Sequence, residues 1–300
     1  MNAATNNSAL RQILAPAVIV GALGYFVDVY DLILFSIVRK ASLLDLGIPD
    51  DQLLPVGIHL LNLQMLGMLV GGIAFGILGD KLGRVVLLFG SILLYSAANI
   101  ANGFVHSIEA YGFWRFVAGF GLAGELGGGI TLVTEVLSKE TRAYGTMIVA
   151  SVGVFGAVVG GLVADLVHWR NAYFVGGGLG LLLLILRVSV AESGMFKQMR
   201  SQEKIQRGNF LCLFTNWNRF GKYLRCILIG LPLWFVIGIL VTFSPEIGKA
   251  LQINGEINAA HAVAFAYVGI TLGGFASGFF SQQLRSRKKI IFAFIIFTFL

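Results

Sequence analysis

Long uninterrupted runs of apolar residues are the feature that most constrains the fold of this 300-residue chain. A helix needs about 20 mostly apolar residues to cross the hydrocarbon core of a bilayer. Eight complete runs of this kind occur, and a ninth begins at Ile290 and reaches the last residue, Leu300. The complete runs are Ile13–Val38, Pro55–Leu78, Val85–Val105, Ala110–Leu137, Thr146–Val167, Ala172–Val190, Tyr223–Ile247 and Asn258–Gln282. Because the runs are continuous instead of alternating, they predict an all-α integral membrane protein with about eight to nine transmembrane helices and exclude a β-barrel.

The composition excludes several classes of function. Apolar residues make up 57% of the chain and charged residues 12%, whereas soluble domains carry about 25% charge. An ordinary soluble enzyme, a disordered chain and a nucleic-acid-binding domain are therefore all disfavoured. Cys212 and Cys226 form neither a disulfide framework nor a CxxC metal pattern, and the four histidines are dispersed with no HExxH motif. We expect no enzymatic activity, no metal and no cofactor, and a lipid bilayer as the surrounding partner.

The basic residues predict the orientation of the chain. Cytoplasmic loops of membrane proteins carry an excess of Lys and Arg. With the N-terminus in the cytoplasm, the outside loops hold only four basic residues, which are Arg39, Lys40, Arg170 and Lys249. The inside segments hold most of the others, including a cluster that runs from Arg187 to Arg225. The expected localisation is a multi-pass protein of the cell membrane, either the plasma membrane or a bacterial inner membrane.

A long polar segment divides the chain into two unequal parts. We expect a cytoplasmic tail at residues 1–11, a six-helix bundle at 12–191, a cytoplasmic linker at 192–221 and a partial bundle at 222–300. A degenerate internal repeat supports the division, because the glycine-rich helix end at 76–84 recurs at 278–288.

Several short motifs resemble one family. The stretch Gly76-x-Leu78-x-Asp80-Lys81-x-Gly83-Arg84 closely resembles the loop 2–3 signature of the major facilitator superfamily, and Arg115-x-x-x-Gly119-x-Gly121 is similar to another of its elements. Within that family, Asp28-Val-Tyr-Asp31, Gly124-Glu125 and Glu192–Phe196 look most like the metabolite and aromatic-acid proton symporters. The resemblance implies two six-helix halves. Twelve spans need about 400 residues, so we expect this chain to be truncated within the ninth helix.

Charged residues inside the spans are the candidate coupling site. A charge at the centre of a membrane helix costs at least about 2.5–3.5 kcal/mol, so such residues are usually buried, paired and functional. Asp28 and Asp31 are three residues apart and lie on one face of the first helix, and Arg115 is expected at a matching depth on the fourth. We expect proton coupling or substrate contact at these residues, with Arg115 attracting a carboxylate and Tyr30 contacting the body of the substrate. The alternatives are a static buried salt bridge, or that Asp28 and Asp31 face the outer vestibule.

Glu125 lies deeper in the fourth helix, about 15 Å beyond Arg115. No basic residue is near it in the sequence. Two interpretations stay open: a second proton site, or a neutral acid that forms a hydrogen bond to a neighbouring helix.

A second charged group is expected at the cytoplasmic ends of the second, third and fourth helices. The family resemblance implies that Asp80, Arg84 and Glu135 form a charge-paired latch, with Gly76 and Gly83 permitting its close turn. The alternative is a surface ion cluster, which contributes little when exposed. The role of the latch would be gating and not substrate choice.

The sequence therefore predicts a secondary transporter with alternating access between two helical bundles. The expected activity is symport of a small organic anion with protons. The alternatives are a proton-coupled exporter of drugs or metabolites, and a non-functional truncated remnant of a transporter.

Overall fold

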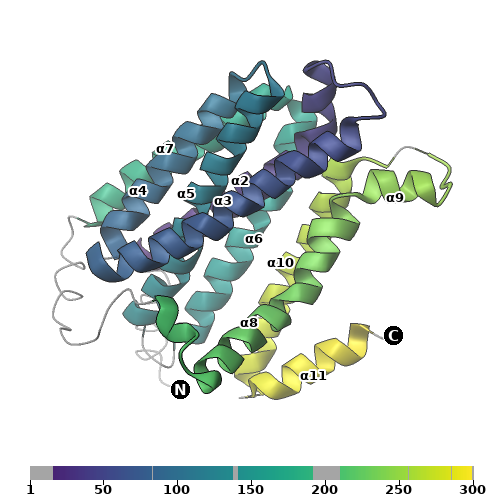
Figure 1. Ribbon diagram of the computed structural model, residues 1–300. Helices are drawn as coiled ribbons and strands as arrows, with labels where there is room; N and C mark the ends of the chain where they lie inside the picture. Colours follow the sequence, from purple (N-terminus) through teal and green to yellow (C-terminus); the bar gives the residue numbers. More distant parts are fainter. Residues whose placement is uncertain are drawn as a thin grey trace.

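The computed structural model describes residues 16–82, 84–137, 141–191, 210–255, 257–284 and 286–298. These residues form helices joined by short connections, and the described part contains no strand (Figure 1). The first six helices are α2 (Pro16–Asp45), α3 (Leu53–Leu82), α4 (Arg84–Gly103), α5 (Ile108–Val136), α6 (Arg142–Leu166) and α7 (Trp169–Ala191). The later elements are η2 (Phe210–Leu213), α8 (Trp217–Phe235), η3 (Val236–Val241), α9 (Ser244–Ala250), α10 (Ala259–Gln283) and α11 (Arg287–Thr298).

The helix α2 lies in the interior of the first bundle. It packs against α5, α6 and α7, while α3 packs on α5, and α4 packs between α5 and α7 (Figure 1). Almost every side chain from Val27 to Arg39 is buried, so α2 is enclosed on all sides over this stretch. Close approach to α6 depends on Gly156, where a Cβ would overlap the backbone carbonyl of Phe26. A small residue at that point lets the two helices pack backbone to backbone.

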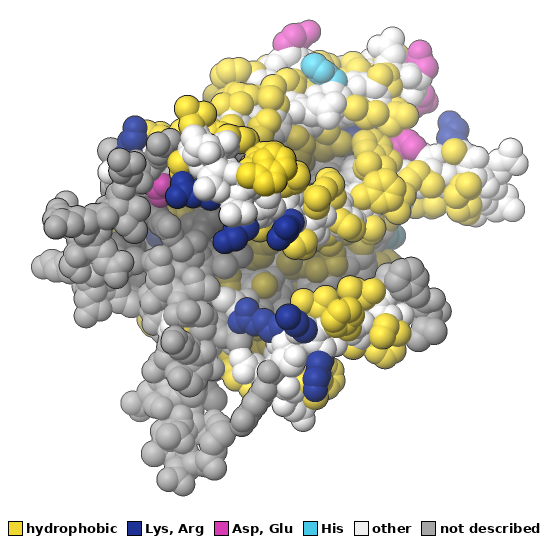
Figure 2. Space-filling model, turned by 60° about the horizontal axis from the view of Figure 1, so that its bottom comes forward, with side chains coloured by type: hydrophobic (Ala, Val, Ile, Leu, Met, Phe, Trp, Pro, Cys, Tyr) yellow, Lys and Arg dark blue, Asp and Glu magenta, His cyan; other side chains and the backbone are white. Residues whose placement is uncertain are grey.

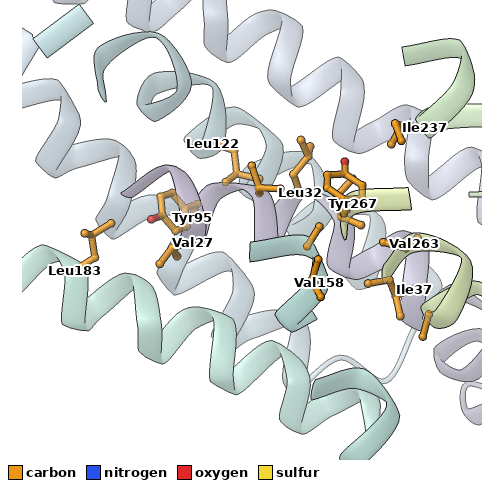
Figure 3. Packing of buried hydrophobic residues seen from close by; sticks show 14 of the residues in the cluster. Val27, Leu32, Ile37, Tyr95, Leu122, Val158, Leu183, Ile237, Val263 and Tyr267 are labelled. Atoms are coloured by element: carbon orange, nitrogen blue, oxygen red, sulfur yellow. The ribbon is translucent and has the colours of Figure 1, made fainter. Parts of the chain in front are cut away.

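The hydrophobic core follows α2 in both directions. At one end Val27 packs with Tyr95 of α4, Leu122 of α5 and Leu183 of α7 (Figure 3). At the other end the core continues through Ile37 to residues of α6, α10 and η3, which are Val158, Val263, Tyr267 and Ile237. One core therefore joins the first bundle to the beginning of the second.

The helix α10 holds the C-terminal elements against the first bundle by packing along α6. Small residues line this contact: a Cβ at Gly161 would lie 3.1 Å from the carbonyl oxygen of Ala260, and one at Gly274 would lie 2.8 Å from the hydroxyl of Ser151. By contrast, α8 buries none of its side chains. Its apolar surface is consistent with contact to lipid.

The seventh span differs from its predicted range, Tyr223–Ile247. The helix α8 begins at Trp217, contains Pro232 and widens into the π-helix η3. Pro232 interrupts the hydrogen bonding of α8, because proline has no N–H to donate and its ring displaces the preceding turn. The span ends near Val241, and α9 is a separate short helix.

Three polar contacts join the first bundle to the C-terminal elements at the same end of the molecule. Arg39 on α2 forms an ion pair with Glu246 on α9. Asp165 on α6 lies 2.9 Å from Nε2 of His261 on α10, and Asn258 also donates to Asp165 at 3.3 Å. These contacts lie at the end of the bundle opposite the start of α8 (Figure 1).

The predicted fold class is confirmed. Six described helices, counting α8 with η3 as one, are long and apolar enough to cross a membrane, and α4 contains a shorter apolar stretch at Leu87–Gly103. The fourth predicted span, α5, carries Glu109, Arg115 and Glu125, which lower its apolar content. The chain is an all-α, multi-pass membrane protein.

Candidate functional site

The predicted acids of α2 lie in the interior of the first bundle. Asp28 and Asp31 are 1% and 0% exposed, and none of their four carboxylate oxygens has a hydrogen-bond partner among the described residues. Asp31 lies at the middle of α2, with 15 helical residues before it and 14 after it. A carboxylate in this environment pays a large desolvation cost unless a proton or a counter-charge neutralises it.

Arg115 of α5 reaches the same region and is fully buried. Its Nη1 atom donates to the hydroxyl of Tyr173 at 3.0 Å, and its guanidinium lies 5.4 Å from the ring centres of Phe35 and of Tyr173. Its Nε and Nη2 atoms have no hydrogen-bond partner among the described residues. Arg115 is thus held by one hydrogen bond and two aromatic rings, with further donors left over for an anion.

A chain of hydroxyl groups extends from Arg115. The hydroxyls of Tyr173 and Tyr111 lie 2.8 Å apart, and Tyr111 donates to the hydroxyl of Ser42 on α2 at 3.2 Å. These residues come from α7, α5 and α2, so the chain connects three helices. Since buried hydroxyl networks fix the side chains that they join, Arg115 has a defined position.

The surroundings of Asp31 leave no space for a larger neighbour on α7. A Cβ at Gly176 would overlap Oδ1 of Asp31 and lie 3.0 Å from the Tyr30 ring. Arg115 and Asn99 are the side chains whose charge and polarity act on the carboxylate, but no ion pair within 4.0 Å joins Asp31 to Arg115 in the described part of the chain. The two are neighbours and not a closed salt bridge, so both keep the capacity to bind a further group.

Tyr30 is held by a hydrogen bond to the neighbouring helix α7. Its hydroxyl donates to the backbone carbonyl of Ala172 at 2.9 Å, and the side chain is fully buried. The hydrogen bond ties α2 to α7. Contact of Tyr30 with a substrate remains a prediction. Its phenolic proton is donated to the Ala172 carbonyl.

Glu125 has a partner that the sequence did not reveal. Arg187 of α7 donates to it through both terminal nitrogens, with Nη1 2.8 Å from Oε2. Glu125 is 1% exposed and Arg187 7% exposed. Arg187 was counted with the basic cluster of the inside segments, whereas α7 turns it inward, 62 residues along the chain from its partner. The signal that could have found it is its position inside the apolar run Ala172–Val190.

The ion pair lies directly beside α2. A Cβ at Gly24 would overlap Nη2 of Arg187 and lie 2.9 Å from Oε1 of Glu125. Asp28, one turn further along α2, is close enough for its charge to act on both members of the pair. Tyr95 of α4 faces the same three charges. The predicted acids therefore divide into two neighbouring groups: Asp31 with Arg115, and Asp28 with Glu125 and Arg187.

The predicted cytoplasmic latch lies largely beyond what the structure describes. Gly76 and Asp80 are exposed at the end of α3, and Asp80 has an interaction of its own. Gly83 falls outside the described residues. Arg84 and Glu135 lie in α4 and α5, but their side chains are not among those described. The latch stays a prediction.

A bundle of membrane helices around buried, incompletely paired acids and arginines defines the chain as a polytopic membrane protein. The chain belongs to the Major Facilitator Superfamily, whose family model matches residues 21–300.

Relatives of known name agree with this membership. The chain is 24% identical over 280 residues to the sialic acid transporter NanX of Escherichia coli, and this match covers 91% of this chain and 66% of that protein. It is 33% identical over 171 residues to the low affinity inorganic phosphate transporter 3 of Petunia hybrida, covering 52% of this chain and 32% of that protein. The chain thus spans between about one third and two thirds of the length of these relatives.

The solved structures show the same fold. The proton:xylose symporter XylE, bound to a bromodeoxyglucose, superimposes with a TM-score of 0.63 at 14% identity, over 89% of this chain and 68% of that chain. At this level of identity the likeness concerns the arrangement of helices and not the substrate.

Proposed function

We propose that this protein is a secondary transporter that moves a small organic anion together with protons by alternating access. The observation that carries the proposal is the Asp31–Arg115 neighbourhood: a buried carboxylate without a hydrogen bond next to a buried arginine with unused donors. Arg115 offers the donors and the positive charge that a carboxylate or phosphate recognises. Asp31 can take up a proton when an approaching anion makes its own negative charge unfavourable.

Membership of the family supports transport as the class of activity. The relatives are named for sialic acid, inorganic phosphate and niacin or nicotinamide, and the structural neighbour for a proton-coupled sugar. Three of these four groups include an anionic solute, which agrees with Arg115 as the contact. We propose no single substrate among them.

We propose that the N-terminus lies in the cytoplasm and that the membrane is a plasma or inner membrane. The face at the bottom of Figure 1 comes forward in Figure 2, where Lys and Arg side chains gather. Six of the exposed basic residues at that end lie at the starts of α8 and α11. They are Arg219, Lys222, Arg225, Arg287, Lys288 and Lys289. An excess of basic residues at one end supports a cytoplasmic position for that end.

The test is uptake by proteoliposomes with an imposed pH gradient. Sialic acid, nicotinate, inorganic phosphate and xylose form the first panel of radiolabelled solutes. We expect uptake of an anionic solute to depend on an acidic outside and to be lost in Arg115→Gln, while Asp31→Asn abolishes the dependence on the gradient. Asp50→Asn, at an exposed position before α3, is the matched control. Efflux driven by the gradient would favour an exporter, and no gradient-dependent movement of any solute would contradict the proposal.

A further inference from the structure

The buried charges of the first bundle do not balance. Apart from Arg39, which pairs with Glu246, the described buried charged side chains are three acids and two arginines. These residues are Asp28, Asp31, Glu125, Arg115 and Arg187. If every group were ionised, the interior would hold one uncompensated negative charge, which costs several kcal/mol in a low-dielectric environment. One further positive charge therefore has to be present.

The geometry indicates which acid lacks a counter-charge. Glu125 is bound by both terminal nitrogens of Arg187, so this pair is closed. Asp31 has Arg115 as its charged neighbour. Asp28 shares its surroundings with two other acids, Glu125 and Asp31, and its nearest arginine is already used by Glu125.

Charged and titratable groups surround Asp28 from α4, α5 and α7 and from α2 itself. Facing Asp28 are Glu125 from α5, Arg187 from α7 and Tyr95 from α4, and Tyr25 lies on α2 itself. The helix α6 contributes Gly153 next to Tyr25 and no charge. Among the described side chains, none supplies Asp28 with a second cation or a hydrogen-bond donor.

We infer that Asp28 holds a proton in this conformation, distinct from the proton that Asp31 takes up with an anion under the proposed function, and that Arg187 is a positioning residue which confines this proton to Asp28 by neutralising Glu125. The proton bonds to one carboxylate oxygen of Asp28, arrives from water and returns to water, and no other bond changes. This deepens the proposed proton symport by assigning one proton to one residue. Arg187 was not a candidate in the sequence, and its role is to fix the charge state of its neighbours and not to contact a substrate.

Infrared spectroscopy of the purified protein in lipid tests the inference without a substrate. A protonated carboxyl group has a C=O stretching band that a carboxylate lacks, and exposed carboxylates are ionised at neutral pH. We expect one such band at neutral pH, its loss in Asp28→Asn, and its retention in the surface control Asp50→Asn. Since the measurement reads the proton itself, its failure is distinguishable from a failure of the transport assay.

Variants of the ion pair give opposite results, which a merely structural role of Arg187 would not produce. Arg187→Gln leaves Glu125 without its counter-charge, so both Glu125 and Asp28 should be protonated and the band area should double. Glu125→Gln frees Arg187 to pair with Asp28, so the band should disappear. The double variant has the same net charge as the wild-type cluster and should show one band, and it keeps the test decisive if Arg187→Gln does not fold.

The outcomes that overturn the inference are equally defined. A band that persists in Asp28→Asn assigns the proton to another acid. A band that persists in Glu125→Gln removes the positioning role of Arg187. Absence of the band in the wild-type protein, with appearance of the band when sodium is withdrawn, would mean that the missing positive charge is a metal cation and not a proton.

Discussion

The ion pair between Arg39 and Glu246 leads to a prediction about how the two parts of the protein are held together. Arg39 lies on α2 and is 3% exposed, while Glu246 on α9 is 30% exposed. The Arg39 guanidinium also lies 4.8 Å from the ring centre of Phe243, and its aliphatic part packs against Gly57 of α3. Glu246→Gln would leave Arg39 in this buried position without a counter-charge.

The expected cost follows from the exposure of the two partners. Exposed ion pairs contribute about 0–1 kcal/mol, and loss of one partner from a buried pair costs about 3–5 kcal/mol. Because Arg39 is buried and Glu246 is partly hydrated, we expect the loss of this pair in Glu246→Gln to cost about 2 kcal/mol. Because 1.4 kcal/mol corresponds to a factor of ten, the ratio of joined to separated α2 and α9 ends should fall about 30-fold.

Double electron–electron resonance measures this ratio directly. Spin labels at Leu44 and Leu251, both exposed at this end, report the distance between α2 and the chain after α9. The labels require a background in which Cys212 and Cys226, which are free, have been replaced. We expect a longer-distance population in Glu246→Gln.

A double-mutant cycle separates the pair from its surroundings. If the ion pair holds the ends together, the effect of Glu246→Gln should be much smaller in an Arg39→Gln background. Effects that add to within about 0.3–0.5 kcal/mol would refute the reasoning, since they would show that the two side chains act independently. An unchanged distance distribution in both single variants would do the same.

Two further predictions concern the interior of the first bundle. Gly176→Ala should abolish proton-dependent transport and destabilise the protein by about 1–3 kcal/mol, because its Cβ would overlap the Asp31 carboxylate; Gly178→Ala, with no atom within 4 Å, is the control, and equal activity of the two variants would contradict the prediction. Tyr173→Phe should lower the free energy of unfolding by about 1–3 kcal/mol, because Arg115 loses its hydrogen-bond acceptor. Thermal unfolding in detergent measures it, and an unchanged midpoint would show that the hydroxyl is dispensable.

The membrane class and the family of this protein followed from its sequence. Apolar runs of about 20 residues predict spanning helices because an unpaired backbone group is costly in lipid, and α-helices satisfy all their backbone groups internally. The glycine and charge motifs around Asp80 and Arg115 indicated the superfamily, and the family model over residues 21–300 confirmed it. The acids Asp28, Asp31 and Glu125 were also visible, since any charge within an apolar run is conspicuous.

The partners of those acids were decided only by the tertiary structure. Arg187 is distant from Glu125 along the chain, and a position near the end of a helix is equally compatible with a solvated linker or with a buried ion pair. Which of the two occurs depends on the rotation of α7 about its own axis. It also depends on Gly24 of α2, which leaves room for the guanidinium. The same holds for Tyr173, Gly176 and Arg39, whose partners lie on other helices. Sequence patterns determine which segments enter the membrane, because that depends on the hydrophobicity of each segment alone. The charge balance of the interior depends on which faces of the packed helices meet, and those contacts exist only in the folded chain.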